Sequence, residues 1–201
     1  MRLNEIGATS FCPTLNWNKA YLNLTSVYTK IDGHNILHFT DSIHDFYLIA
    51  SNSGKLLAYI AVKNEGSEYL SLERIENISK NPRIYGLSTM IIIALVAKGM
   101  KFVIKDTESL TYSGISWLCK TLSINSELKI TDQNDQVPTI KELQNEWETS
   151  KEAKGMPSGP TSIYIEDGGI NISRINENND KWNEAKLLKP LYHYFGDKRI
   201  L

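Results

Sequence analysis

Short apolar runs separated by polar turn sequences dominate the chain between residues 35 and 78. Asn52–Gly54 and Asn64–Ser67 carry the Asn, Ser and Gly residues that favour tight turns between strands. The runs on either side of each turn have the length of a strand, so we expect an antiparallel meander of about three strands. The predicted segments are Asn35–Phe39, Phe46–Ala50, Lys55–Val62 and Tyr69–Ile78.

The alternation of apolar and polar residues is interrupted in the last run, Tyr69–Ile78. Leu70 and Leu72 are separated by one residue, whereas Leu72 and the next apolar residue, Ile75, are separated by Glu73 and Arg74. Such a slip indicates an extra residue in the strand. We therefore predict a β-bulge or a bend between Leu72 and Ile75.

The pattern changes after residue 80. Asn81–Gly86 predicts a loop, and Leu87–Lys98 predicts an apolar helix that Gly99 closes. The run Met100–Lys105 predicts a strand directly after that glycine. A strand, a helix and a strand in this order favour a right-handed crossover in which the two strands are parallel and adjacent. A second helix is predicted over Tyr112–Leu122.

The two ends of the chain contain further patterns. An N-terminal helix is predicted from the spacing of Trp17, Tyr21, Leu24 and Tyr28, with Asn16 as its cap and Asp32 and Gly33 at its end. Later segments predict strands at Leu128–Thr131 and Thr161–Glu166, a polar helix at Thr139–Lys154 and a hairpin strand at Ile170–Ile175. We therefore divide the chain into a core at residues 1–124, including the N-terminal helix, and an extension at residues 125–201. The extension either completes the sheet or forms a small appendage.

Composition places the chain among globular proteins. Its 201 residues are 41% hydrophobic, and 22 Lys and Arg residues nearly balance 23 Asp and Glu residues. That balance argues against binding nucleic acid through bulk positive charge. The apolar run Met90–Ala97 is too short to cross a bilayer, and the first residues lack the apolar core of a secretory signal. Two cysteines, Cys12 and Cys119, are too few for a disulfide scaffold. We expect a cytoplasmic protein.

Arg83–Thr89 is the strongest candidate segment for ligand binding. Backbone N–H groups at the start of a helix lack partners within the helix, and the helix dipole adds positive potential there. Phosphate groups favour such a place. The side chains of Arg83, Ser88 and Thr89 offer further donors. An ordinary capped helix accounts for the same residues without any ligand.

Arg83, Gly86 and Ser88 match, in order, the Arg/Gln-x-x-Gly-x-Gly/Ala motif of the GCN5-related N-acetyltransferase (GNAT) family, with Ser88 replacing the last small residue. The order of predicted elements over about residues 35–123 also resembles that family. The resemblance implies an α/β fold with a mixed, mostly antiparallel central sheet and flanking helices. In the family, the two central strands separate beside the motif, a bulge in the fourth strand helps to open the gap, and the pantetheine arm of acetyl-CoA pairs with the exposed strand edge.

The resemblance also implies site residues. Backbone groups near Ile75–Ile78 would face the pantetheine arm, and Arg83–Thr89 would hold the pyrophosphate. Many family members use a Glu on the fourth strand as the general base for the acceptor amine, and Glu73 and Glu76 are the candidates by position. An exposed strand face also accounts for either residue. The implied cofactor-binding residues are Ile75, Ile78, Arg83, Ile84, Tyr85, Gly86, Leu87, Ser88 and Thr89.

Many family members place a Tyr on the second helix as proton donor to the leaving thiolate. In this chain Cys119 occupies that place within Leu118–Ile124. A thiol can donate a proton, Tyr112 or Tyr85 can substitute for it, and Cys119 can equally belong to the packed face of the helix. The four histidines follow no zinc-ligand spacing, so we expect no metal site.

These observations favour transfer of an acetyl group from acetyl-CoA to an amine on a small molecule or a protein. Two alternatives stay open. One is a catalytically degenerate GNAT-like protein, of phage or mobile-element type, that binds a host macromolecule. The other is a GNAT-like enzyme that modifies a nucleic-acid base, which the balanced charge disfavours. We expect no membrane contact, and the sequence leaves catalysis itself and a homodimer open.

Overall fold

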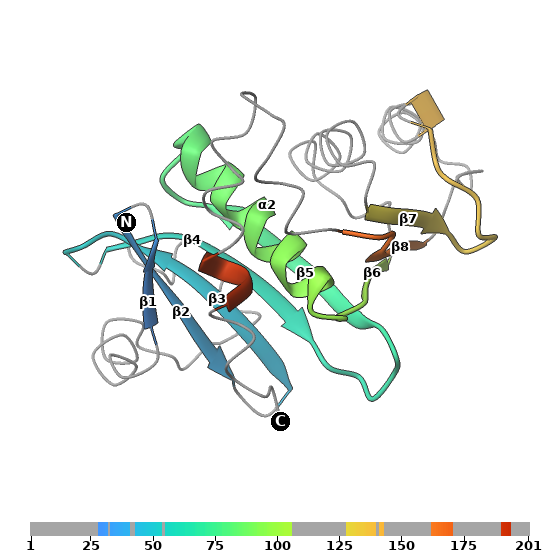
Figure 1. Ribbon diagram of the computed structural model, residues 1–201, viewed down its shortest axis with the longest axis horizontal. Coiled ribbons are helices and arrows are strands. Elements are labelled where there is room, and N and C mark those ends of the chain that lie inside the picture. The colour runs from blue at the N-terminus through green and yellow to red at the C-terminus, as the bar shows by residue number, and fades with distance from the viewer. Residues whose placement is uncertain are drawn as a thin grey trace, which may run out of the picture.

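The computed structural model describes residues 28–31, 33–40, 43–53, 55–105, 128–139, 141–142, 162–170 and 190–193. Within these ranges the chain is an α/β fold dominated by one eight-stranded mixed sheet (Figure 1). The strands lie in the order β1-β2-β3-β4-β5-β6-β8-β7. The predicted class, with a mixed and mostly antiparallel sheet, is confirmed, since β5 and β6 form the one parallel pair among the described strands.

The first five strands form an antiparallel meander in which each strand pairs with the next. Short polar turns join β3 to β4 and β4 to β5, so both predicted hairpins and the strands between residues 35 and 78 are confirmed. The five strands are β1 (Tyr28–Ile31), β2 (His34–Thr40), β3 (His44–Ala50), β4 (Leu56–Lys63) and β5 (Leu70–Asn77).

The predicted N-terminal helix is wrong where it reaches the described residues. Tyr28 lies in β1, which pairs with β2 from Tyr28 opposite Leu37 to Ile31 opposite His34. Gly33 has a φ of 74° and makes the tight turn between these strands instead of ending a helix. Pairing with β2 and the burial of Ile31 favour the extended backbone here. The rest of that predicted helix lies outside the described residues.

Helix α2 (Pro82–Ala97) begins earlier than the sequence pattern predicts. The loop predicted at Asn81–Gly86 is therefore wrong, because all its residues after Asn81 belong to the first turns of the helix. Proline is favoured at the first helical position, where its missing N–H costs no hydrogen bond. The backbone N–H of Ile84 closes the first turn on the Asn81 carbonyl, with an N···O distance of 3.1 Å.

The predicted end of this helix at Gly99 is confirmed. The Gly99 N–H donates to the Val96 carbonyl at 2.8 Å, the Met100 N–H donates to the Leu95 carbonyl at 3.1 Å, and Gly99 has a φ of 89°. This pair of bonds is a Schellman motif, which satisfies carbonyl groups that a helix end otherwise leaves without partners. The chain then turns directly into β6 (Phe102–Lys105).

Helix α2 covers one face of the sheet, where it contacts β4 and β5 among other strands (Figure 1). Its residues from Met90 to Val96 are all buried, as expected for a helix that is apolar on every side. A separate apolar cluster packs on the opposite face of the sheet. The α2 face includes Tyr47, Ile60, Val62, Leu72 and Phe102, and the opposite face includes Leu37, Phe46, Leu48, Tyr59 and Ala61.

Two strands from the predicted C-terminal extension belong to the same sheet. They are β7 (Leu128–Asp132) and β8 (Ser162–Asp167), close to the predicted strands at Leu128–Thr131 and Thr161–Glu166. β8 lies between β6 and β7 and pairs antiparallel with both. β6 and β7 occupy both edges of β8 over residues 163–165, which leaves no free edge there for the predicted hairpin with Ile170–Ile175, and the residues after Ile170 in that prediction lie outside the described residues.

Other predictions fall mostly or wholly outside the described residues. The predicted helix Tyr112–Leu122 lies there entirely. At the predicted start of the polar helix Thr139–Lys154, the Thr139 N–H donates to the Glu142 carboxylate at 2.7 Å and the Glu142 N–H donates to Thr139 Oγ1 at 3.1 Å, which is a capping box. None of the helices in the described ranges has the length and apolar character needed to span a bilayer.

Candidate functional site

The parallel strands β5 and β6 separate soon after they begin to pair. Their register contains only Leu70 opposite Phe102 and Ser71 opposite Val103, although both strands continue beyond these residues. On its other side β5 stays paired with β4 as far as Asn77. The two strands therefore diverge in the middle of the sheet, at a point where a crossover helix follows β5.

A β-bulge lies at the point of divergence. Val62 of β4 pairs with Leu72 and Ala61 pairs with Arg74, so Glu73 is the extra residue of β5 and has no register partner on β4. The predicted bulge between Leu72 and Ile75 is confirmed. An extra residue bends its strand and increases the local twist, which turns β5 away from β6 just after their last pair.

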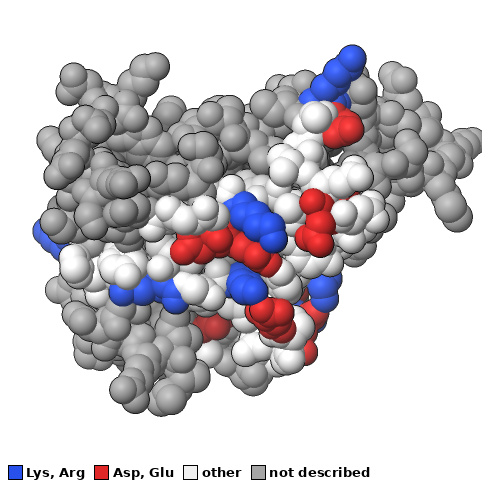
Figure 2. All heavy atoms as spheres, turned by 45° about the vertical axis from the view of Figure 1, so that its right-hand side comes forward, with Lys and Arg blue, Asp and Glu red and all other residues white. Residues whose placement is uncertain are grey.

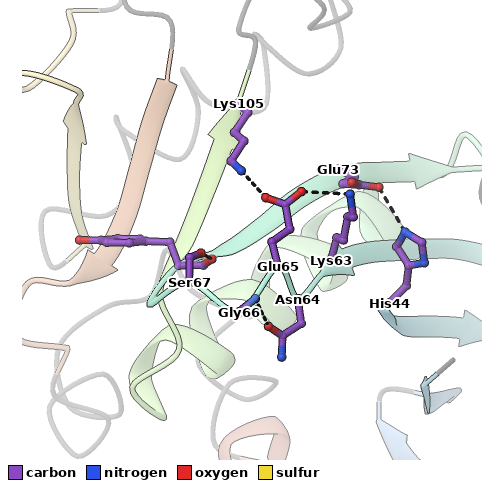
Figure 3. A network of polar contacts seen from close by, with 9 residues as sticks. His44, Lys63, Asn64, Glu65, Gly66, Ser67, Glu73 and Lys105 are labelled. Atoms are coloured by element: carbon purple, nitrogen blue, oxygen red, sulfur yellow. Dashed lines mark hydrogen bonds and ion pairs between the residues drawn. The ribbon is translucent and has the colours of Figure 1, made fainter. Parts of the chain in front are cut away.

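The Glu73 carboxylate faces an imidazole from another strand (Figure 3). His44 stands at the start of β3, and its Nε2 lies 3.6 Å from Glu73 Oε2. The side chain of His44 is 10% exposed and that of Glu73 is 21% exposed. The His44 ring packs beside Phe46, with 5.7 Å between the ring centroids. Because Phe46 belongs to the cluster opposite α2, this acid–base pair lies on that face of the sheet.

Glu76, the second candidate base, is held by two donors. The Tyr59 hydroxyl donates to Glu76 Oε2 at 2.9 Å, and Arg74 Nε lies 3.0 Å from the same oxygen. Burial raises the pKa of Tyr59 far above its ordinary value, and the adjacent Glu76 carboxylate adds to this while the Arg74 charge opposes it. Glu76 thus belongs to a cross-strand polar cluster, whereas Glu73 faces a histidine.

Two ion pairs that share Glu65 connect β4 to β6. Lys63 Nζ lies 3.0 Å from Glu65 Oε1, and Lys105 on β6 donates to the other oxygen of Glu65 (Figure 3). Both hydrogen bonds lower the pKa of the Glu65 carboxyl, and the bond from Lys105 has the larger effect. The hydrogen bond to Glu65 raises the pKa of Lys63, and the Glu73 charge adds a smaller contribution. Figure 2 shows the same mixing of charge over the described surface, where basic and acidic side chains are interleaved.

The predicted cofactor segment occupies the first turns of α2. Ile84 and Leu87 are buried in the core, at 1% and 2% exposure. Ser88 is fully buried and its hydroxyl donates to the Ile84 carbonyl at 3.1 Å, so this hydroxyl is used within the helix instead of facing a ligand. Gly86 and Thr89 are partly exposed. The side chains of Arg83 and Tyr85 are not among those described.

Ile75 and Ile78 lie at the end of β5 and just beyond it. Ile75 packs against the core on the α2 face, and Ile78 packs against the opposite cluster. Their side chains are thus structural, and any contact with a ligand here is through the backbone. Cys119 and Tyr112, the candidate proton donors, lie outside the described residues.

The sequence reasoning did not select His44. Its grouping with His34 and His38 was the available signal, but spacing along the chain could not show which of the three meets a carboxylate at the bulge. His38 lies on the other face of the sheet, stacked on Tyr47 at 4.7 Å and with Nε2 2.8 Å from Asp45 Oδ1. Among the described residues, no three His, Cys, Asp or Glu side chains gather as metal ligands do.

Comparison with protein-family models, curated proteins and solved structures finds no match for this chain. The geometry of β5, β6 and the start of α2 therefore provides the basis for a functional proposal.

Proposed function

We propose that the protein is an acyl-CoA-dependent N-acyltransferase with a GNAT-like arrangement of its central strands. The observation that carries this proposal is the divergence of the parallel strands β5 and β6 beside the Glu73 bulge, immediately before a crossover helix. Bulge, diverging strands and helix stand in the order that the resemblance of Arg83, Gly86 and Ser88 to the family motif implies.

Acetyl-CoA would lie in the gap between β5 and β6. Beyond Ser71, the β5 edge that faces β6 offers backbone groups to the amides of the pantetheine arm, as an added strand would use them. In the first turn of α2, Pro82 has no N–H and the Ile84 N–H is bonded to the Asn81 carbonyl, so the pyrophosphate would use the remaining N–H groups together with the positive end of the helix dipole. In this proposal Ser88 contributes small size rather than a donor, since its hydroxyl is already bonded within the helix.

Glu73 is the better candidate for the general base. An acceptor ammonium must lose a proton before its nitrogen can attack the thioester carbonyl. The Glu73 carboxylate lies at the bulge where β5 leaves β6, and it is partly exposed. Glu76 Oε2, in contrast, already accepts a hydrogen bond from the Tyr59 hydroxyl and lies beside Arg74. Holding the amine and the thioester together in this gap would supply much of the rate.

The cofactor proposal is tested first by ligand-induced stabilisation. Acetyl-CoA at a hundred times its Kd should add about 2.7 kcal/mol to the free energy of unfolding. For a chain of this size that corresponds to a rise in Tm of about 5–10 °C. In Gly86→Glu a carboxylate enters the segment that would hold the pyrophosphate, so the acetyl-CoA shift should be smaller. If the native protein shows no shift at millimolar acetyl-CoA, the proposal is wrong.

Catalysis is tested with a panel of primary amines and detection of free CoA thiol. Glu73→Gln should reduce transfer by about a hundredfold or more, the usual contribution of a general base. Glu76→Gln is the matched control on the same strand and should reduce it much less. Cofactor binding without transfer to any amine would instead support the degenerate binding protein, and equal losses in the two variants would contradict the assignment of Glu73.

A further inference from the structure

His44 and Glu73 differ in their access to solvent. Glu73 is the more exposed member, at 21% of its side chain, and His44 is at 10%. His44 Nε2 faces the carboxylate, while its Nδ1 is shielded from solvent. A molecule that approaches from solvent therefore reaches the Glu73 carboxylate more readily than the His44 ring.

The two groups also differ in intrinsic basicity. A carboxylate in water has a pKa near 4.3 and an imidazole one near 6.5, so a proton shared between them at neutral pH favours the imidazole. A base works best when its pKa is close to the operating pH. A carboxylate alone is a weak acceptor for the proton of an ammonium group. An adjacent neutral imidazole, as the stronger base, can take that proton from the carboxyl group.

We propose that Glu73 and His44 form a proton relay for the acceptor amine, an inference that rests on the proposed acyl transfer. An N–H bond of the acceptor ammonium breaks, and its proton binds to Glu73. The proton on Glu73 Oε2 then moves through one bridging water to His44 Nε2, 3.6 Å away, and so forms an imidazolium beside a restored carboxylate. The freed nitrogen lone pair attacks the thioester carbonyl. The second proton leaves the nitrogen as the amide forms and goes to the departing thiolate of CoA. After the amide has left, the imidazolium returns its proton through Glu73 to solvent.

The register places one charged side chain beside the pair. Lys63, from β4, is the register partner of His44, and its charge also interacts with that of Glu73. Lys63 forms an ion pair with Glu65, and Glu65 forms a second ion pair with Lys105 of β6. On β3 the next residue, Asp45, pairs with His38 on the opposite face of the sheet. Among the described residues, Lys63 is linked through Glu65 to Lys105, and Arg74, which follows Glu73 on β5, pairs with Glu76.

The relay requires a neutral imidazole at the start of each turnover, so kcat/KM should rise with pH as His44 loses its proton. His44→Gln should lower kcat/KM by about a hundredfold and move the acidic limb of the profile toward the range of a free carboxyl. His38→Gln is the matched control, since it removes a histidine–carboxylate pair of similar exposure from the other face. It should leave the shape of the pH profile unchanged.

A second measurement does not depend on replacing the buried ring. In NMR at one fixed pH, the His44 Nε2 signal should move in Glu73→Gln, because the variant replaces the carboxylate that lies 3.6 Å from this atom. A native acidic limb retained in folded His44→Gln, or an unchanged His44 Nε2 signal in Glu73→Gln, would overturn the relay. If acetyl-CoA fails to bind or no amine is acylated, the proposed function fails, and the relay fails with it. If acylation proceeds without these effects, only the relay fails.

Discussion

At the scale of single residues, the two carboxylates of β5 differ because of one inserted position. Without the bulge, Glu73 and Glu76 would point to opposite faces of the strand, since side chains alternate. With Glu73 as the extra residue, its carboxylate meets His44 on the same face where Glu76 meets Tyr59. Sequence position identified both as candidates, but the choice between them depends on partners from β3 and β4.

Tyr59→Phe tests the structural role of Glu76. A buried hydrogen bond to a charged group contributes about 1.5–3 kcal/mol, so the variant should lose about that much stability in urea unfolding at pH 7. In a double-mutant cycle with Glu76→Ala, which leaves no acceptor for the Tyr59 hydroxyl, the two losses should not add, because each variant removes the same bond.

The same variant has a defined pH dependence. Burial raises the pKa of Tyr59 in the folded protein. Its contribution is therefore fully present below about pH 10, the ordinary value of a tyrosine, and it is lost as pH rises toward the folded pKa. The difference in stability between native protein and Tyr59→Phe should shrink above that pH. Equal stability of the two proteins at pH 7 would contradict the interaction.

At the scale of elements, prediction succeeded where the signal is local. Alternating apolar residues and Asn, Ser and Gly turns define the hairpins, and Gly99 alone marks the end of α2. The start of α2 was misplaced because Gly86 was given more weight than Pro82, although proline favours the first helical position. β1 was missed because Tyr28 fits a helical spacing, and only pairing with β2 decides its conformation.

Deletion of Glu73 tests whether the bulge opens the gap. Removal of the extra residue leaves Val62 opposite Leu72 and Ala61 opposite Arg74 in an unbroken register. We expect the deletion variant to fold, as judged by circular dichroism, and to lose the rise in Tm caused by acetyl-CoA.

Glu73→Ala is the control for that deletion. It removes the carboxylate and keeps the extra backbone residue, so it should retain the acetyl-CoA shift while it loses transfer. A deletion variant that still responds to acetyl-CoA would show that the bulge is not needed for binding.

At the scale of the whole molecule, ion pairs connect the turn between β4 and β5 to the far half of the sheet. The Glu65 carboxylate forms ion pairs with Lys63 and Lys105. Lys101 donates a hydrogen bond to Glu68 and lies 4.0 Å from Glu166 of β8. These links join segments on both sides of the diverging strands. Individually, exposed pairs contribute little, and salt screens them.

Glu65→Gln should therefore lower Tm slightly at neutral pH and low ionic strength. The lowered pKa of Glu65 means that its contribution is present above the ordinary pKa of a glutamate and is lost as pH falls through the folded value. The difference from native protein should disappear as pH falls well below the ordinary pKa of a glutamate, and also in about 1 M NaCl, where the Debye length is about 3 Å. A difference that persists in high salt would indicate a packing effect instead.

The place of β8 between β6 and β7 has a consequence for how the protein is made (Figure 1). A ribosome releases β7 well before β8, yet β7 reaches the sheet only through β8. Until residue 167 has emerged, β6 exposes an open edge in the middle of the future sheet, and such edges invite pairing with other chains. Chains whose synthesis stops before Ser162 would therefore be far more prone to aggregate than the finished protein.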